Sequence, residues 1–355
     1  MDMCKWDMNK ELYKAFLNCE NEKVLMAVTC IRDGTHYVGR RPPVNSPEAM
    51  REWYFDAQGV YDRCIERTAA TNFYGQAFPS ASAYFGTGGD AKYFKGCRYQ
   101  LTEETVWFFP SLEHEDLPEY LGQDSILSNE LAYVRQLGKL GIGKYLVAVP
   151  DNCGMVDTLA NLCGSEVLLE YMLEDPDWVK ACLRRIMDAY FDSTQRFYEA
   201  LCESNFGGST HGWMQLWVDG KLQHLQADFC VMISPKMFEE FILPDLEEAC
   251  NWLDYSIYHF DGQEQIRHLD MLLSINKLNT IQWTHVAGQP DFTAFIPVYK
   301  KIQAAGKGLI LAPTSVKQAK ELIENLEPQG LYLVINANNE VEAKEYLSLI
   351  STAGV

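Results

Sequence analysis

Short, strongly apolar runs recur along the chain, and each is followed by turn residues and then by a helical pattern. Runs that are apolar at consecutive positions suit strands buried on both faces, as parallel strands covered by helices are. We therefore predict eight strands, at residues 23–29, 80–85, 144–151, 212–218, 255–261, 280–286, 308–313 and 331–337.

Between these runs, the spacing of apolar residues predicts helices at 47–71, 154–173, 176–203, 235–253 and 315–326. Asp175-Pro176 and Ser234-Pro235 each place a capping residue before a proline at the first helical position. In the C-terminal part the strand starts are roughly 25 residues apart, which is about one strand–helix unit. The pattern predicts an α/β fold, a closed (β/α)8 TIM barrel with an N-terminal elaboration. It forms a single domain over residues 1–355, with a helical extension at 1–22.

The competing layout is an open, doubly wound parallel sheet. Such a sheet requires a glycine-rich turn after its first strand, and "TCIRDGTHYVG" is not one.

Charge narrows the classes of partner. The 355 residues include 49 acidic and 30 basic ones, for a formal charge of −19. This balance provides no electrostatic footprint for nucleic acid or for an anionic membrane. The start lacks the basic and apolar regions of a signal peptide, so we expect a cytoplasmic protein. The 11 cysteines show no regular framework, which indicates reduced thiols.

Polar residues gather where the predicted strands end, and in a barrel these carboxyl ends carry function. The set comprises Arg32, Asp33, His36, Asp151, Asn152, Trp217, Asp219, Asp228, His259, Asp261, His285, Gln289, Asn336 and Asn338. Other candidates have simpler interpretations. We expect His268 and Asp270 to lie on the following helix as surface or packing residues, and Cys153 and Cys230 to be inert buried thiols. The tryptophans are expected to fill the core or to line an apolar pocket: Trp213, Trp217, Trp252 and Trp283.

The segment "YSIYHFDG" places His259 and Asp261 two residues apart at a strand end. Period-two geometry points both side chains to the same face, which suits a metal site or an acid–base pair. The alternative is that Asp261 caps the following helix while His259 packs inside the barrel.

The run "DFCVMISPKMFEEFILPDLEEACNWLDYSIYHFDG" resembles the uroporphyrinogen decarboxylase superfamily, which includes the corrinoid-dependent methyltransferases that methylate coenzyme M. In that superfamily an SP-x-x-F-x-E-F-x-x-P helix leads into a strand ending H-x-C-G. Here the strand ends His259-Phe260-Asp261-Gly262, and the segment "VPDNCGMVDTLANLCGSEVLLEYMLEDPDWV" is also similar. The resemblance covers residues 140–350 best and implies a (β/α)8 barrel.

Departures from the superfamily pattern narrow the expected activity. The decarboxylases carry R-Q-A-G-R-Y after the first strand, and this chain has "CIRDGTHYVGRRPP". We therefore expect no turnover of uroporphyrinogen. The methyltransferases hold zinc through H-x-C-G and a second cysteine, whereas here Asp261 replaces the first cysteine and "LYLVINANN" contains none.

The resemblance therefore favours a corrinoid-dependent methyltransferase that acts on a small methylated metabolite. The expected catalytic residues are His259, Asp261, Asp151 and Arg32; the expected substrate-binding residues are Trp217, Asn152, Gln289 and Asn336. Zinc or another divalent metal would be held by His259, Asp261, His285 and Asp228. The expected partners are the substrate, a corrinoid protein that carries the corrinoid cofactor and a second copy of the chain, without nucleic acid or membrane.

Two alternatives stay open. One is a decarboxylase or other lyase of a small acid, in which Arg32 holds a carboxylate. The other is a non-catalytic barrel that binds a small ligand or a corrinoid protein.

Overall fold

The computed structural model describes residues 3–35, 37, 39, 46–83, 86, 88–103, 105–122, 125–152 and 154–352. Its centre is a seven-stranded sheet in the order β2-β1-β13-β12-β11-β10-β9. All neighbouring strands in this sheet are parallel except β1 and β2. The strands are β1 (Leu25–Ile31), β2 (Thr71–Gly75), β9 (Leu222–Leu225), β10 (Tyr255–Asp261), β11 (Thr280–Thr284), β12 (Gly308–Leu311) and β13 (Leu331–Asn336).

Three further pairs of strands extend this framework. β3 (Ser80–Ser82) is parallel to β6 (Leu146–Ala148), while β4 (Arg98–Leu101) with β5 (Val106–Phe109) and β7 (Ser209–His211) with β8 (Leu216–Val218) form antiparallel pairs. The amide of Val149 donates to the carbonyl oxygen of Thr210 at 3.0 Å and so joins the end of β6 to β7. The described strands therefore form a mixed α/β fold with a largely parallel central sheet.

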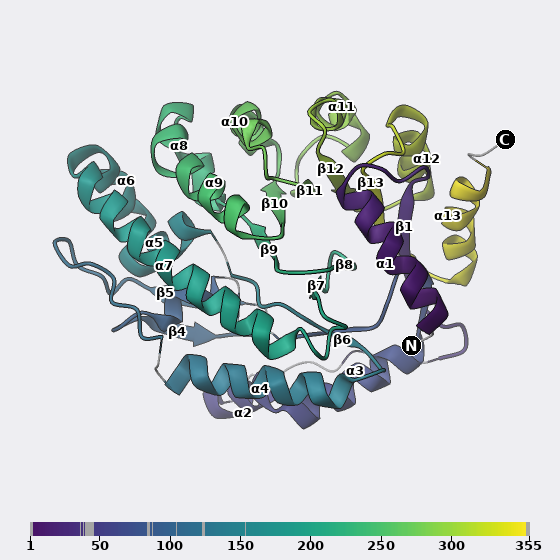
Figure 1. Ribbon diagram of the computed structural model, residues 1–355, viewed down its shortest axis with the longest axis horizontal. Helices are drawn as coiled ribbons and strands as arrows, with labels where there is room; N and C mark the ends of the chain where they lie inside the picture. Colours follow the sequence, from purple (N-terminus) through teal and green to yellow (C-terminus); the bar gives the residue numbers. More distant parts are fainter. Residues whose placement is uncertain are drawn as a thin grey trace.

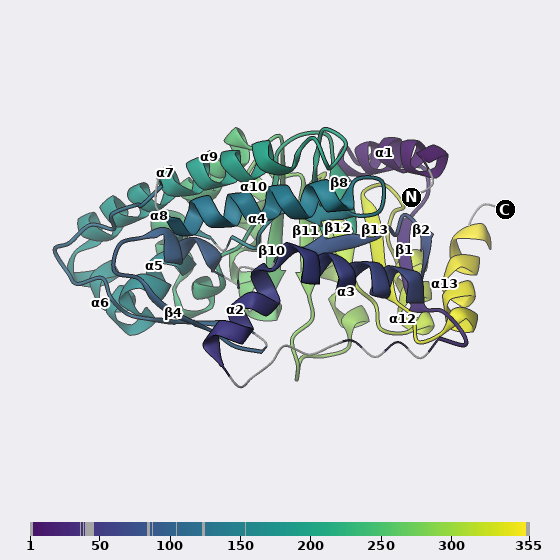
Figure 2. The same cartoon turned by 90° about the horizontal axis from the view of Figure 1, so that it is seen from below.

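Helices cover the outer side of the parallel strands. Figure 1 shows α8–α13 along β9–β13, with α2–α4 on the opposite side of the molecule. In Figure 2, α3 and α4 run side by side. The helices are α1 (Met3–Leu17), α2 (Pro47–Phe55), α3 (Ala57–Ala70), α4 (Ser125–Gly141), α5 (Met155–Cys163), α6 (Ser165–Glu174), α7 (Pro176–Leu201), α8 (Pro235–Phe241), α9 (Leu243–Trp252), α10 (Leu269–Ser274), α11 (Ile296–Ala304), α12 (Val316–Asn325) and α13 (Glu340–Thr352), with the 3-10 helices η1 (Gly89–Tyr93), η2 (Asp228–Met232), η3 (Gln263–His268) and η4 (Phe292–Phe295).

The sequence-based helices are correct in place but too long in three cases. The predicted helix 47–71 divides at Asp56, whose carboxylate accepts hydrogen bonds from the amides of Gln58 and Gly59 and so starts α3. The helix 154–173 divides at Gly164, whose φ of 94° is outside the helical region. The helix 235–253 divides at Ile242. The predicted caps are confirmed, because Asp175 and Ser234 accept hydrogen bonds from the amides of Trp178 and Met237.

The predicted strand 212–218 is wrong in part. Gly212–Gln215 form the turn between β7 and β8, and the strand parallel to β10 is β9. The apolar pattern did not predict β9, because the polar residues Gln223 and His224 occupy its centre. Both side chains are buried, and each forms a hydrogen bond that satisfies its polar atoms. The strand 80–85 is confirmed at 80–82, and its residues 84 and 85 lie outside the described residues.

One face of the central strands changes from apolar to polar along its length. Near the amino ends, Leu25, Ile257, Ile310 and Tyr332 pack with aromatic residues of α1. Because successive residues on one face are two apart, the same rows continue to the polar residues Thr29, His224, His259, Asp261, Gln282, Thr284 and Asn336. Helix α1 therefore fills the amino end of this space, and the carboxyl end is left for polar chemistry.

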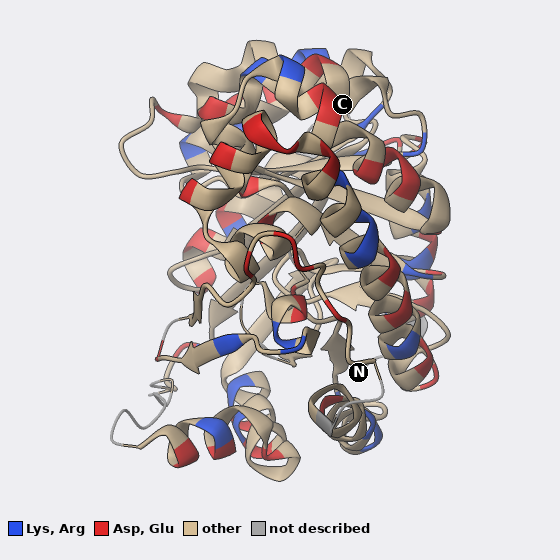
Figure 3. Cartoon of the chain, turned by 90° about the vertical axis from the view of Figure 1, so that its left-hand side faces the viewer, with Lys and Arg blue, Asp and Glu red and all other residues tan. Residues whose placement is uncertain are grey.

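Charges on the outer helices are mixed. Figure 3 shows acidic and basic segments interspersed along them. Between neighbouring helices, Lys180 contacts Glu240 at 2.7 Å and Arg184 contacts Glu248 at 2.7 Å. None of the described helices combines the length and apolar character that crossing a membrane requires.

A buried polar network joins η1 to α4 and α7. Lys92 Nζ lies 2.7 Å from Glu130 Oε1, and the Tyr93 hydroxyl donates to Glu130 Oε2 at 2.6 Å. Nearby, Asp90 is almost fully buried and accepts a hydrogen bond of 3.3 Å from the Ser193 hydroxyl. Burial raises the pKa of Asp90 to about 7, although the neighbouring Lys92 opposes this.

Asp90→Asn is expected to flatten the pH dependence of stability. The folded state keeps a proton on Asp90 that the unfolded state releases near pH 4, so this group destabilises the fold as pH rises from about 4 to 7. Its contribution is at most about 1.4 kcal/mol per pH unit. Urea unfolding at pH 5 and pH 7.5 should show a smaller loss of unfolding free energy in the variant than in wild type. Equal losses in both proteins would contradict this account.

Candidate functional site

The candidate site begins at the carboxyl end of β10. His259 and Asp261 lie on the same face of that strand and are both half-buried. Gly262 follows with φ of 82°, and a Cβ there would lie 2.4 Å from Gln289 Nε2. Glycine thus permits the backbone to turn away while both side chains remain in the polar space.

Asp228, the first residue of η2, joins this pair. Ligand atoms of Asp228, His259 and Asp261 all lie within 4.8 Å of one another, an arrangement that fits a metal ion. Asp228 Oδ1 is buried and has no hydrogen-bond partner among the described residues. Burial, followed by the nearby carboxylates of Asp157 and Asp261, raises the pKa of Asp228 to about 8. A divalent cation between the carboxylates would remove this repulsion.

Gln282 and Thr284 on β11 orient the His259 ring. His259 Nδ1 lies 2.6 Å from Gln282 Oε1, and the Gln282 amide donates to the Thr284 hydroxyl at 3.0 Å. Because a carbonyl oxygen only accepts, Nδ1 carries the proton and Nε2 keeps its lone pair free. Burial and the nearby His224 lower the pKa of His259, which also favours the neutral ring that binds metals.

Gln282→Leu is therefore expected to weaken divalent-metal binding by about 10- to 100-fold, because the His259 ring loses the partner that fixes its tautomer. Competition with a chromophoric chelator measures this change. Gln289→Leu is the control, since Gln289 lies beside Gly262 and has no contact with the His259 ring in the described structure. Equal Zn2+ affinity of Gln282→Leu and wild type would exclude this role for Gln282.

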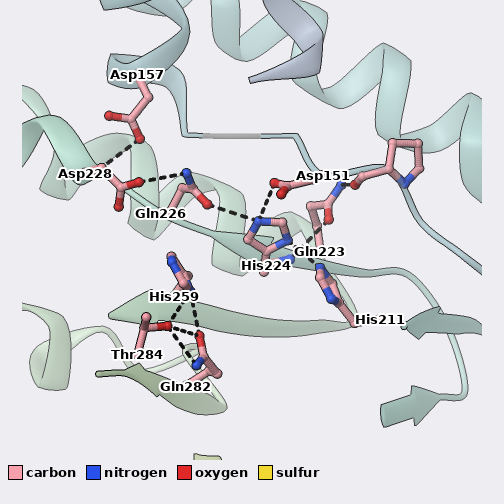
Figure 4. A network of polar contacts seen from close by, with 11 residues as sticks. Asp151, Asp157, His211, Gln223, His224, Gln226, Asp228, His259, Gln282 and Thr284 are labelled. Atoms are coloured by element: carbon pink, nitrogen blue, oxygen red, sulfur yellow. Dashed lines mark hydrogen bonds and ion pairs between the residues drawn. The ribbon is translucent and has the colours of Figure 1, made fainter. Parts of the chain in front are cut away.

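A second group of polar residues continues from Asp228 (Figure 4). The Gln226 amide donates to Asp228 Oδ2 at 3.2 Å, and Gln226 Oε1 lies 3.1 Å from His224 Nε2. The same nitrogen lies 2.9 Å from Asp151 Oδ1, so it carries the proton that both oxygens attract. His224 Nδ1 then accepts from His211 Nε2 at 2.6 Å. One chain of hydrogen bonds therefore connects His211 with Asp228, and the ion-pair contact of His224 joins Asp151 to this chain.

Electrostatics distinguish the members of this chain. His211 is fully buried, and burial, together with the adjacent His224, lowers the pKa of His211 well below its usual value. Burial raises the pKa of Asp151, but the adjacent His224 outweighs burial and gives a net lowering. Asp151 is therefore the anionic end of the chain.

Asp157 of α5 fixes the position of η2. Its carboxylate accepts hydrogen bonds from the amides of Asp228 at 3.0 Å and Phe229 at 2.8 Å. Burial raises the pKa of Asp157 to about 6, and these two amides oppose that rise. The backbone contact holds Asp228 next to β10.

Trp213 forms an aromatic wall beside the site. It lies in the turn between β7 and β8, and 49% of its surface is exposed. Its ring centroid lies 5.7 Å from that of His259 and 5.3 Å from that of His211. Trp213 also lines a cavity of about 410 Å³.

The structure brings Asp151, Asp228, His259 and Asp261 of the predicted set together. Asn336 lines the adjacent cavity, and Asn152 is buried next to Asp151. Gln289 contacts the loop that follows β11 through the Val286 amide.

Three predicted residues lie elsewhere. Trp217 packs on α1 with its centroid 5.8 Å from that of Trp6, and its indole nitrogen donates to the carbonyl oxygen of Asn205. Arg32 is exposed at the end of β1, and His285 is exposed and packs against Phe292 and Phe295. Short apolar runs set strand ends only within a few residues, which is why the sequence placed these side chains in the site.

The remaining predictions concern His36 and Cys153, which lie outside the described residues, and three further residues. His268 is buried and stacks on Phe238, whereas Asp270 contacts Lys301 on the exterior. Cys230 is buried, and burial raises the pKa of its thiol to about 12. These three placements agree with packing and surface roles.

The sequence analysis missed His211, His224, Gln226 and Gln282. The signal was present in "LQHLQAD", in which polar residues interrupt an apolar strand on the row that leads to Asp228. A buried strand that carries histidine and glutamine at its centre indicates a polar network.

Comparisons with known proteins give one finding. No family model and no curated protein matches the chain in sequence. Among solved structures, the chain is similar to a methyltransferase from Methanosarcina mazei, with a TM-score of 0.64 and 13% sequence identity over 98% of this chain and 99% of that chain. The two proteins therefore share a fold over nearly their whole lengths.

Proposed function

We propose that this protein is a divalent-metal-dependent methyltransferase that acts on a small methylated metabolite and transfers its methyl group to a corrinoid protein. The observation that carries the proposal is the cluster of Asp228, His259 and Asp261 at the carboxyl ends of parallel strands, in a fold shared with a methyltransferase. We further propose that the six parallel strands of the central sheet, without β2, and the β3–β6 pair together form one (β/α)8 barrel.

The residues present fit a metal ion. Asp228 Oδ1 is buried and has no hydrogen-bond partner in the part of the chain that the structure describes, and the neutral His259 directs Nε2 away from its bond to Gln282. Two carboxylates and one imidazole form a harder donor set than thiolates, and Zn2+ accepts this set in catalytic sites. When bound, such an ion supplies Lewis-acid polarisation of a coordinated heteroatom of the substrate.

The residues around the metal cluster would contact the substrate and hold the polar groups beside it in place. Trp213 covers one side of His259 and would contact the methyl-bearing end of a substrate. In methyl transfer the bond between heteroatom and methyl group would break, the heteroatom would keep its electron pair, and the reduced corrinoid of the partner protein would supply the electron pair of the new bond to the methyl group. Water would supply the proton that this heteroatom takes up, while His224, whose Nε2–H points to Asp151, would hold that carboxylate beside the site as an anion.

Methyl transfer is tested with reduced cobalamin as the acceptor and metal-loaded protein. Methanol, methylamines, methyl thioethers and methoxylated aromatic acids serve as donors, and absorbance reports methylcobalamin. We expect a donor from this panel to give methylcobalamin with wild type and none with His259→Ala. Failure of metal-loaded wild type with every donor would overturn the proposed function.

A further inference from the structure

The cavity beside Trp213 differs from the metal cluster in its chemistry. Its volume is about 410 Å³, and it is bounded by β1, β13, the β2–β3 segment and the turn that carries Trp213. Hydroxyl groups of Thr29, Ser80 and Ser82 and the amide of Asn336 supply polar contacts, while Phe73, Phe78 and Trp213 supply aromatic surface.

Arg67 is the one charged residue among the described residues that line this cavity. It comes from the last turn of α3, and its guanidinium donates to the carbonyl oxygen of Ser80. No described carboxylate lies within ion-pair distance of it, although the whole chain carries a charge of −19. A guanidinium has five donors in a planar fork, so most of its capacity remains for an anion.

The part of the lining around Asn336, Thr29 and Gly212 carries no charge. Asn336 Oδ1 accepts a hydrogen bond of 2.6 Å from the Thr29 hydroxyl, which leaves the Asn336 amide group as a donor. Gly212 also lines the cavity and packs closely on its neighbours, because a Cβ there would lie 3.1 Å from Ala148 Cβ and 3.4 Å from Ser80 Oγ. Cationic and neutral donors thus surround a partly aromatic space.

We propose that this cavity binds the anionic end of a small organic acid, a carboxylate or a sulfonate with an apolar body, and that Arg67 is its anion-binding residue. The inference rests on the proposed function in one respect: the other end of this acid would reach past Trp213 to the metal cluster. Trp213 borders both spaces, with its ring 5.7 Å from that of His259. Both arginines are exposed, but Arg67 lines the cavity and Arg32 does not, so the acid anchor is Arg67.

The test uses calorimetric titration of metal-free full-length protein with benzoate, benzenesulfonate and benzamide. We expect both anions to bind at least about tenfold more tightly than benzamide, since the Arg67 guanidinium forms charge-assisted hydrogen bonds with an anion that it cannot form with a neutral amide. Equal binding of benzoate and benzamide, or no binding of either anion, would overturn the proposal. Preference for one anion identifies the acid class.

Substitutions of residues that line the cavity test whether benzoate binds there. Arg67→Gln should weaken benzoate binding at least about tenfold without changing that of benzamide, while the matched control Arg32→Gln should leave both unchanged. Asn336→Asp keeps the acceptor for Thr29 and adds a negative charge, so it should weaken the anions alone even if Arg67→Gln folds poorly. Full benzoate affinity in Asn336→Asp or in folded Arg67→Gln refutes the site.

Asp261→Asn separates this proposal from the proposed function. The variant alters the metal cluster and should retain benzoate binding, because Asp261 does not line the cavity. In wild type, anion binding together with a failure to transfer a methyl group from any donor would support the cavity while refuting the proposed function. Loss of anion binding in Asp261→Asn would contradict the assignment to the cavity.

Discussion

Asp261→Asn and His259→Ala are each expected to lower the affinity for Zn2+ by at least about 100-fold and to leave the thermal midpoint within a few degrees of wild type. Both residues offer a ligand atom to the candidate metal cluster, and even residues behind such ligands change metal affinity by about 10- to 100-fold. Chelator competition and thermal unfolding on the same preparations measure the two effects.

Asp270→Asn is the control, because its carboxylate is 79% exposed on α10 and pairs only with Lys301 on the surface. It should bind Zn2+ as wild type does. If His259 and Asp261 only pack the fold or cap η3, their variants would instead lose about 1–3 kcal/mol of unfolding free energy and keep Zn2+ binding. Destabilised proteins with normal metal affinity would thus refute the metal site.

Lys92→Met is expected to destabilise the protein by about 3–5 kcal/mol, because it leaves the Glu130 carboxylate buried without its cation. The side chains of Lys92 and Glu130 are 1% and 8% exposed and 2.7 Å apart. Lys95→Met is the matched control, since Lys95 and Glu119 form an equally short pair that is 66% and 59% exposed. Urea unfolding should show a much smaller loss of unfolding free energy for the control, because an exposed ion pair contributes little. Similar losses in both variants would contradict the buried network.

The sequence predicted the central part of the site because β10 follows the simplest rule of strand geometry. His259 and Asp261 are two residues apart on a strand, so their shared face follows from local geometry alone. The placement of Asp228 beside them was also predicted, but its cause is tertiary, since Asp157 on α5 holds the amides of η2.

The sequence could not predict the other half of the network. β9 has polar residues at its centre, so its sequence does not resemble that of a buried strand. His224 can be recognised as a site residue only from the folded structure, which places it next to His211 and Asp151. The same limit applies to arginines. Arg32 follows a strand in the sequence, but Arg67, at the end of a helix, lines the cavity.

The fold shows the same division between local and distant causes. Apolar runs predicted β10, β11, β12 and β13 well, because each is buried on both faces. The antiparallel β2 next to β1 and the β7–β8 hairpin were missed. β2 depends on pairing with the distant β1, which no local pattern reports, whereas the β7–β8 hairpin was missed because its turn at Gly212–Gln215 was assigned to a strand.

The metal site is the central claim, and crystals soaked in Zn2+ and measured at the zinc absorption edge test it most directly. The account predicts one strong anomalous peak in contact with a carboxylate oxygen of Asp228, Nε2 of His259 and a carboxylate oxygen of Asp261. A map without a peak at these three residues, or with its peak between His211 and His224 instead, would contradict it.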